Sequence, residues 1–327
     1  MASKKTSVLI VGAGGIAHVH VNCMLAMGKT VRIAGFVEIA DASREKMTAK
    51  FVEKNLPVPP FYLTIKEFLA ANKGPADCAL VLTPHNCHIS QITDCMKAGM
   101  DVLTEKPMVL SGAEARRAIR VRDQTGRLLS VAFPGSYSPA IRKAKELIAA
   151  GEIGNIMSIS VYTYQHWREA TKGLWRQVPE ISGGGFLFDT GSHAVNTMLD
   201  LAGSDVKALC AMQDNRGTPV EISSAIAGRF KSGAFFTICA EGNSIHCQAR
   251  VTVVGDKGVL ITGSAGGFLR VIKPDSWHEK DVEFPPSLGV FEQFLRVRAG
   301  KLKNPCPAEV GLRFAKFMDM VKAAVAK

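Results

Sequence analysis

Short hydrophobic runs alternate with amphipathic stretches over roughly the first 130 positions of the chain. The runs are rich in valine, isoleucine and leucine, which is typical of strands buried on both faces of a sheet, and they lie at 7–11, 31–37, 78–82, 101–105 and 128–133. Capping boxes at Thr64 with Glu67 and at Ser111 with Glu114 predict two helix starts, and Gly126 fits the position just past a helix. Strands and helices that alternate with such short turns predict a doubly wound parallel sheet with right-handed crossovers over residues 1–132.

From about residue 156 the pattern changes to β segments that follow one another directly. These segments lie at 156–164, 206–213, 221–230, 234–241, 248–255 and 258–263. Residues 255–258, Gly-Asp-Lys-Gly, predict a hairpin turn between the last two. We therefore expect residues 133–327 to form an α+β domain with an open, mostly antiparallel sheet, one face of which needs cover. The helical spacing of apolar residues near the end predicts a terminal helix at about 307–325 that packs back on the first domain.

A glycine-rich turn follows the first predicted strand directly. Gly12, Gly14 and Ala17 form the pattern G-x-G-x-x-A, in which the glycines permit a tight turn and a close approach to a pyrophosphate. Glu38 ends the second strand, where a carboxylate can bind the ribose hydroxyls of NAD and repel the 2′-phosphate of NADP. Arg44 lies close enough in sequence to tolerate that phosphate, so NAD is favoured and NADP stays possible. The pattern predicts a Rossmann domain with cofactor contacts from Gly12, Gly14, Gly15, Ile16, Ala17 and Glu38.

Composition narrows the class of protein further. The chain has 327 residues, of which 47% are hydrophobic and 21% charged, as in globular proteins with two domains. Without a run of eighteen apolar residues, no membrane span is predicted. The net charge is +11, but the densest basic stretch, at 116–127, is interleaved with acidic residues and lacks aromatic ones. We expect a solvated helix face there and no nucleic-acid partner.

The cysteine pattern favours a reducing compartment. All eight are scattered without a C-x-x-C pair, which favours free thiols over disulfides or a metal site. The N-terminal segment, with two lysines before the first apolar run, resembles a signal peptide. That run, however, continues directly into the glycine-rich turn, so we do not interpret it as one. We expect a cytoplasmic protein without a metal ion.

Four segments resemble a known family in order and at its spacing. They are residues 12–20, 81–108, 137–156 and 174–203, and they include Glu-Lys-Pro at 105–107 and an Asp-x-x-x-His pair. Over nearly its full length the chain resembles the glucose–fructose oxidoreductase/inositol dehydrogenase (Gfo/Idh/MocA) family. The resemblance implies a catalytic set of Lys106, Asp189 and His193, and often a cis peptide bond before Pro107.

The residues themselves suit this chemistry. Lys106 follows a parallel strand, where it can stabilise an alkoxide, although a surface lysine would look the same. Asp189 and His193 are four positions apart, so on a helix they share one face, and an imidazole can take a hydroxyl proton near neutral pH. Without the resemblance, a histidine among apolar helix residues is more often a core residue. The preceding glycines at 183–185 suggest a close approach to a ligand.

The remaining candidates are less specific. For the cofactor we expect further contacts from Thr83, Pro84, His88, Glu105 and Lys106, although His88 could equally cap its helix. For a sugar or polyol ring we expect contacts from His166, Trp167, Trp175 and Arg176, of which the tryptophans could equally be core. One position departs from the family pattern: where relatives often carry an arginine, this chain has Ser136.

These features predict hydride transfer between NAD, or NADP, and a secondary alcohol of a sugar, inositol or related polyol. The resemblance implies a homodimer or homotetramer formed through the C-terminal sheet. Two alternatives remain open at this stage. One is a redox-neutral glycosidase of the same fold that retains NAD, and the other is a dinucleotide sensor that does not turn over.

Overall fold

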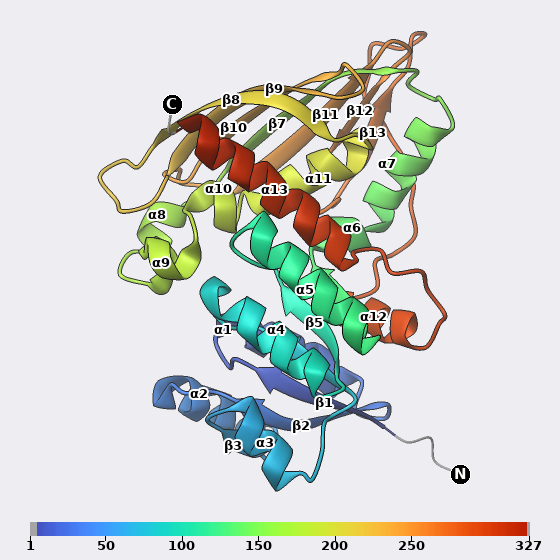
Figure 1. The fold of residues 1–327 in the computed structure, drawn as a ribbon. Helices are drawn as coiled ribbons and strands as arrows, with labels where there is room; N and C mark the ends of the chain where they lie inside the picture. Colours follow the sequence, from blue (N-terminus) through green and yellow to red (C-terminus); the bar gives the residue numbers. More distant parts are fainter. Residues whose placement is uncertain (1–4, 326–327) are drawn as a thin grey trace. The chain divides into compact units, whose positions relative to one another are not determined.

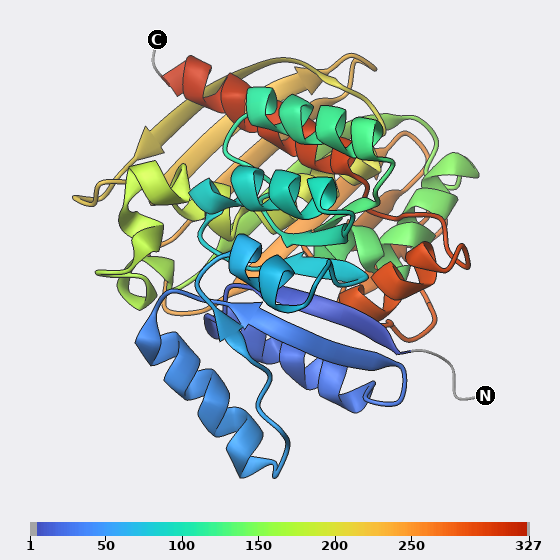
Figure 2. The same ribbon diagram turned by 60° about the horizontal axis from the view of Figure 1, so that its bottom comes forward.

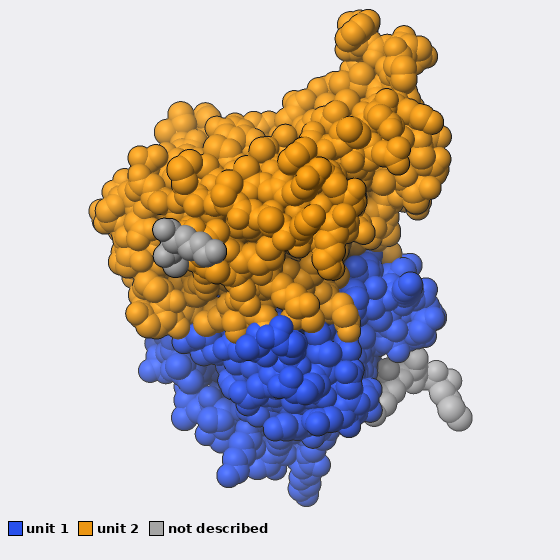
Figure 3. Space-filling view, turned by 45° about the horizontal axis from the view of Figure 1, so that its top comes forward, with its two compact units in different colours: residues 1–109, 113–132, 289–308 blue, residues 110–112, 133–288, 309–327 orange. Residues whose placement is uncertain are grey.

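The computed structural model describes residues 5–325. The chain divides into two compact units, which Figure 3 shows in different colours. Unit 1 comprises the described residues up to Val109 together with Ala113–Ala132 and Gly289–Ala308. Unit 2 comprises Leu110–Gly112, Phe133–Leu288 and the described residues from Glu309 onward. The segment from Gly289 to Ala308 therefore belongs with the N-terminal part of the chain.

Unit 1 is built on a six-stranded sheet in the order β3-β2-β1-β4-β5-β6 with every pairing parallel (Figure 1). Its strands are β1 (Thr6–Val11), β2 (Val31–Val37), β3 (Phe61–Tyr62), β4 (Cys78–Val81), β5 (Asp101–Glu105) and β6 (Leu129–Ala132). Its helices are α1 (Gly15–Ala26), α2 (Asp41–Glu53), α3 (Ile65–Ala71), the 3-10 turn η1 (His85–Cys87), α4 (His88–Lys97), most of α5 (Gly112–Thr125), and α12 (Val290–Arg298). The predicted doubly wound parallel sheet is confirmed.

The core of unit 1 explains why the short hydrophobic runs form its strands. Val8 and Ile10 of β1 are fully buried, as expected for the central strand of a sheet with both faces covered. Phe291 and Phe294 of α12 belong to the same cluster, so a helix from late in the chain completes this core. The predicted capping box is present at α3, where the Thr64 hydroxyl accepts the backbone N–H of Glu67 at 3.1 Å.

Unit 2 contains an eight-stranded sheet in the order β14-β13-β12-β11-β7-β10-β9-β8 (Figures 1 and 2). Its strands are β7 (Ile156–Tyr164), β8 (Val206–Asp214), β9 (Ser223–Phe230), β10 (Phe235–Glu241), β11 (Gln248–Gly255), β12 (Val259–Thr262), β13 (Leu269–Ile272) and β14 (Lys280–Asp281). Its helices are α6 (Pro134–Tyr137), α7 (Pro139–Ala149), α8 (Trp167–Ala170), η2 (Trp175–Gln177), α9 (Pro179–Ser182), α10 (Phe186–Asp189), α11 (Ser192–Ala202) and nearly all of α13 (Ala308–Val325). Every pairing is antiparallel except that of β7 with β10, so the mostly antiparallel prediction is confirmed.

One face of this second sheet is covered by helices. α11 packs on β7 and β11, and α13 runs across the same side of the sheet (Figures 1 and 2). Phe317 of α13 contacts Phe236 of β10, with ring centroids 6.1 Å apart, and Phe314 contacts Phe188 at 5.9 Å. On the other face, alternate residues of the same strands are exposed, as along β10. A partner that covered this sheet would bind to that face.

Candidate functional site

The glycine-rich turn of unit 1 is shaped for a dinucleotide phosphate. Gly12 has a φ of +97°, and a Cβ there would lie 2.9 Å from the backbone carbon of Leu82 in the neighbouring strand end, so only glycine fits. Gly14 precedes α1 as its N-cap, and a Cβ at Gly14 or Gly15 would meet nothing within 4 Å. The first turn of α1 has no side-chain cap among the described residues, so its N–H groups can bind an anion. The turn therefore fits the pyrophosphate of NAD.

Glu38, at the end of β2, is held beside this turn by the backbone. One carboxylate oxygen accepts the N–H of Ala13 at 2.7 Å, and the other accepts the N–H of Ala40 at 2.8 Å. Arg44 donates through Nε to the backbone oxygen of Glu38 at 2.7 Å, and its Nη1 lies 3.5 Å from Asp41. The Nε–H of Arg44 is thus occupied by the backbone at the end of β2.

Thr83, Pro84 and His88 follow β4, at the carboxyl edge of the parallel sheet where ligands bind in such folds. His88 is fully buried, and its two ring nitrogens lie 3.0 Å from the Pro107 carbonyl oxygen and 2.9 Å from that of Thr83. Burial lowers the pKa of His88, against the opposing effect of these carbonyl groups. The ring joins the loop after β4 to the loop after β5.

Glu105, Lys106 and Pro107 lie at the carboxyl end of β5, and the Lys106–Pro107 peptide bond is cis, as the resemblance implied. Glu105 is 3.0 Å from the ring nitrogen of His20 on α1 and accepts the backbone N–H of Lys106 at 3.1 Å. Burial alone raises the pKa of Glu105, but the hydrogen bond and charge of His20, together with Lys106, leave it below its ordinary value. The carboxylate next to Lys106 is therefore ionised at neutral pH.

The second group of predicted residues gathers in unit 2 around Asp189. One oxygen of its carboxylate, Oδ2, accepts the indole N–H of Trp167 at 2.9 Å and the Nε–H of Arg176 at 3.0 Å. Asp189 and Trp167 are only 3% and 2% exposed, whereas the side chain of Arg176 is 35% exposed. The guanidinium of Arg176 also lies over the ring of Trp175, 4.5 Å from its centroid. Three of the four predicted sugar-contacting residues thus meet at, or next to, one carboxylate.

Asp189 and His193 belong to two successive helices, α10 and α11, instead of one. The N–H of Gly191 between them donates to the carbonyl oxygen of Phe186, five residues earlier, at 2.8 Å. That spacing is wider than in an α-helix, and such local widenings are common at functional sites. His193 is half-buried, and its ring meets the ring of Phe133 edge-on.

A residue that the sequence did not single out fixes the start of α10. Glu221 accepts the backbone N–H of Gly185 at 2.5 Å and that of Phe188 at 3.3 Å. Burial raises the pKa of Glu221, which the two N–H groups only partly oppose. Glu221 lies more than thirty positions from this helix in the sequence, and no local motif surrounds it, so no sequence signal marked it.

Two further positions from the sequence analysis, His166 and Ser136, also lie in unit 2. His166 is exposed and its Nδ1 lies 3.1 Å from the carbonyl oxygen of Ser244. Ser136, the position that departs from the family, is buried and donates to Asp200 at 2.6 Å. Asn196 donates to Ser136 at 2.9 Å, and Arg313 of α13 pairs with Asp200. This polar network joins α6, α11 and α13 of unit 2.

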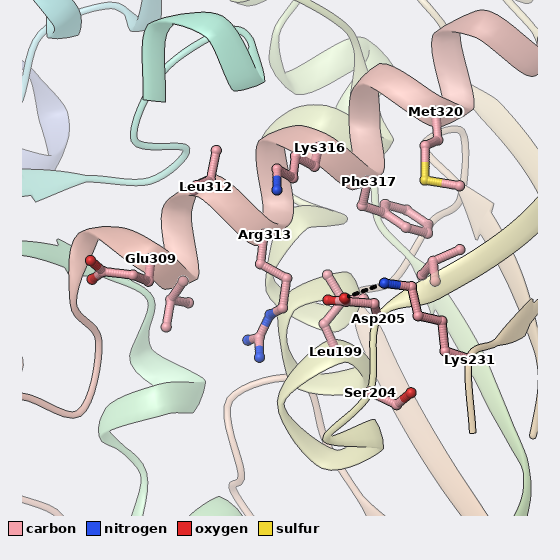
Figure 4. Close-up of a pocket in the computed structure, with 12 residues that line it drawn as sticks. Leu199, Ser204, Asp205, Lys231, Glu309, Leu312, Arg313, Lys316, Phe317 and Met320 are labelled. Atoms are coloured by element: carbon pink, nitrogen blue, oxygen red, sulfur yellow. Dashed lines mark hydrogen bonds and ion pairs between the residues drawn. The ribbon is translucent and has the colours of Figure 1, made fainter. Parts of the chain in front are cut away.

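A pocket of about 510 Å³ in unit 2 lies elsewhere, beside α13 and the start of β8 (Figure 4). Two of its cationic side chains form ion pairs, Lys231 with Asp205 at 2.8 Å and Arg313 with Asp200. It contains none of the predicted site residues. Over residues 5–325, no group of three histidine, cysteine or acidic residues is placed to hold a metal ion. No helix in that range is long and apolar enough to cross a membrane.

Two family models match the chain. Residues 6–133 match the oxidoreductase family with an NAD-binding Rossmann fold, and residues 141–261 match the GFO/IDH/MocA C-terminal domain. The chain belongs to the Gfo/Idh/MocA family of oxidoreductases. It is therefore an NAD(P)-dependent dehydrogenase or reductase with an NAD-binding Rossmann domain.

Individual relatives agree with this assignment. An oxidoreductase of Formosa agariphila is 26% identical over 255 residues, which are 73% of this chain and 76% of that protein. Glucose-6-phosphate 3-dehydrogenase of Bacillus subtilis is 25% identical over 261 residues, 76% of this chain and 71% of that protein. The WlbA dehydrogenase of Bordetella pertussis, solved with NADH and UDP-GlcNAcA, shares the fold with a TM-score of 0.82. It is 21% identical, and the superposition covers 99% of this chain and 97% of that one.

Proposed function

We propose that this Gfo/Idh/MocA protein transfers a hydride between NAD and a secondary alcohol carbon of a sugar, inositol or related polyol. The observation that carries the proposal is the buried Asp189 carboxylate, held by Trp167 and Arg176 four positions before His193. A buried carboxylate is costly unless it is well paired, and a paired carboxylate four positions before a histidine favours a catalytic role for the two.

The roles follow from the chemistry of each group. NAD, when bound, supplies the two-electron acceptor for the hydride that leaves the carbinol carbon. His193 takes the hydroxyl proton as that hydride leaves, and Asp189 orients the substrate or the imidazole tautomer. Lys106, at the end of β5, stabilises the alkoxide character that develops on the oxygen. The net reaction converts an alcohol to a carbonyl, with one hydride to NAD and one proton to His193.

For the cofactor we propose contacts from the glycine-rich turn, Glu38, and the ends of β4 and β5. The full set is Gly12, Gly14, Gly15, Ile16, Ala17, Glu38, Thr83, Pro84, Glu105 and Lys106, with His88 acting through the loops that it joins. Because the Glu38 carboxylate is fixed beside the glycine-rich turn by two backbone N–H groups, we propose NAD over NADP as the cofactor. His166 and Trp175 are proposed to contact the substrate ring.

We propose that the uncovered face of the second sheet binds another copy of this chain. Large apolar side chains are exposed along its strands, including Tyr162, Met212 and Phe235, each more than half exposed. Exposed apolar patches of this kind mark interaction sites. A homodimer or homotetramer would bury them. All eight cysteines are free thiols in the structure, which supports the cytoplasm as the proposed compartment.

The test is nicotinamide reduction by the purified full-length protein with a panel of inositols, aldoses, anhydrosugars and sugar acids. We expect turnover with NAD on at least one polyol, and a loss of about 10²-fold or more in kcat for His193→Ala. His278→Ala, a change of an exposed histidine, is the matched control and should keep full activity. Glycoside cleavage without added nicotinamide would instead favour a redox-neutral glycosidase. NAD binding without turnover on any compound would favour a sensor.

A further inference from the structure

Asp189 is held by two donors that come from separate elements. The indole N–H of Trp167, at the start of α8, and the Nε–H of Arg176, in η2, both reach Oδ2. Hydrogen bonds to an ionised acceptor are roughly twice as strong as neutral ones. Rotation of the carboxylate about its Cβ–Cγ bond would break both contacts at once. The orientation of the carboxylate plane is therefore fixed by its neighbours.

Trp167 is itself held rigidly. Its backbone N–H and that of Arg168 both donate to the carbonyl oxygen of Gly242, at 3.0 and 2.8 Å. Its ring packs edge-on against Phe186, the first residue of α10, with centroids 6.2 Å apart. A Cβ at Gly242 would lie 2.8 Å from the Cβ of Phe186, so a side chain there would push the two segments apart. The donor and the helix that carries its acceptor are thus packed against each other.

Burial separates the functions of the two donors. Trp167 is 2% exposed, so its ring offers little surface to a sugar, whereas the Arg176 side chain is 35% exposed. We propose that Trp167 is a positioning residue of the active site, which with Arg176 fixes the Asp189 carboxylate for its work with His193. Trp167 then acts on the reaction only through Asp189 and does not contact the substrate. This inference rests on the proposed function, in which Asp189 takes part in the reaction.

The hydrogen bond can be tested without any substrate. The chain has three tryptophans, so ¹⁵N labelling of the indole groups gives three signals, which Trp175→Phe and Trp277→Phe assign by elimination. We expect the Trp167 indole proton to resonate downfield and to exchange slowly with solvent. Asp189→Asn should move that signal upfield and leave the signal of Trp277, which is 95% exposed, in place. An unchanged Trp167 signal in Asp189→Asn would overturn the inference.

The kinetic consequence separates positioning from substrate contact. Trp167→Phe keeps the ring and removes the N–H, so we expect kcat to fall by about 10- to 100-fold with KM changed by less than about threefold. Arg176→Lys keeps a charged donor and should lose less kcat than Arg176→Met. Trp277→Phe is the matched control and should behave as the unmodified protein. A raised KM with unchanged kcat in Trp167→Phe would show substrate contact and refute the positioning role.

The two proposals fail in different ways. If the unmodified protein oxidises no compound of the panel, the proposed function is wrong, while the indole signal still decides whether Trp167 holds Asp189. If Trp167→Phe does not fold, the Asp189→Asn spectrum still tests the hydrogen bond of Trp167. The comparison of Arg176→Lys with Arg176→Met still tests the positioning of Asp189, and all these variants keep every tryptophan.

Discussion

Glu38 offers the sharpest test of the cofactor site, because NADH and NADPH binding can be measured without knowing the substrate. Its carboxylate oxygens accept the backbone N–H groups of Ala13 and Ala40 at 2.7 and 2.8 Å, so the charge stays beside the glycine-rich turn. A 2′-phosphate bound at this position would lie close to a fixed negative charge. Substitution by Gln or by Ala removes that charge. Gln keeps one side-chain oxygen that can accept a backbone N–H, whereas Ala keeps none.

The magnitude follows from the charge and the hydrogen bonds. Two unit charges about 4 Å apart repel by about 4 kcal/mol at an effective dielectric constant of about 20. Glu38 is half-buried, and screening by solvent reduces this to about 2 kcal/mol, or roughly 30-fold in relative affinity. Glu38→Gln should therefore shift the NADPH/NADH preference by about 30-fold. Glu38→Ala also loses a hydrogen bond to the ribose 2′-hydroxyl of NADH, worth about 1.5 kcal/mol, and should shift it by about 300-fold.

Titration calorimetry with NADH and NADPH measures both dissociation constants for each variant. Glu45→Gln, at an exposed position on α2, makes the same change in charge and controls for long-range electrostatics. It should leave the ratio of the two constants unchanged. If both Glu38 variants weaken the two cofactors by the same factor, Glu38 does not contact the 2′ position and the reasoning is wrong.

The remaining predictions concern stability and assembly. Because burial raises the pKa of Glu221, its contribution to the free energy of unfolding is fully present below the unfolded-state pKa and is lost as pH rises through the folded-state pKa. Urea unfolding should therefore show Glu221→Gln gaining stability relative to the unmodified protein as pH rises from about 4 to 7, while a pH-independent difference would contradict the raised pKa. Met212→Lys combined with Phe235→Lys should dissociate the proposed homo-oligomer in analytical ultracentrifugation and leave NADH binding by unit 1 intact. An unchanged sedimentation coefficient for the double variant would place the interface elsewhere.

Some of the molecule could be predicted from sequence because it depends on near neighbours. The strands at 31–37, 101–105 and 156–164 have the same bounds in the structure, since burial on one or both faces leaves its mark on consecutive residues. Gly126 lies just past the end of α5, as predicted, with a left-handed φ of +63°, and the turn at 255–258 joins β11 to β12. The two-residue strand β3 was missed, because a strand so short shows no alternation.

The resemblance added what spacing alone could not supply. Lys106 at the end of a strand and His193 in an apolar helix each had an ordinary structural explanation, and the family motif favoured the catalytic one. The matched family models then established the class of enzyme.

The tertiary structure alone decided how the predicted residues are held. Trp167 and Arg176 were assigned to the substrate from their position in the chain, yet their N–H groups converge on Asp189, 22 and 13 residues away. Glu221 reaches the start of α10 from a segment without any motif. Such contacts depend on how loops fold over a sheet. A residue's distant partners are not marked by any pattern in the sequence around it. The sequence by itself therefore determined the elements and the chemistry available, whereas packing determined which groups act together.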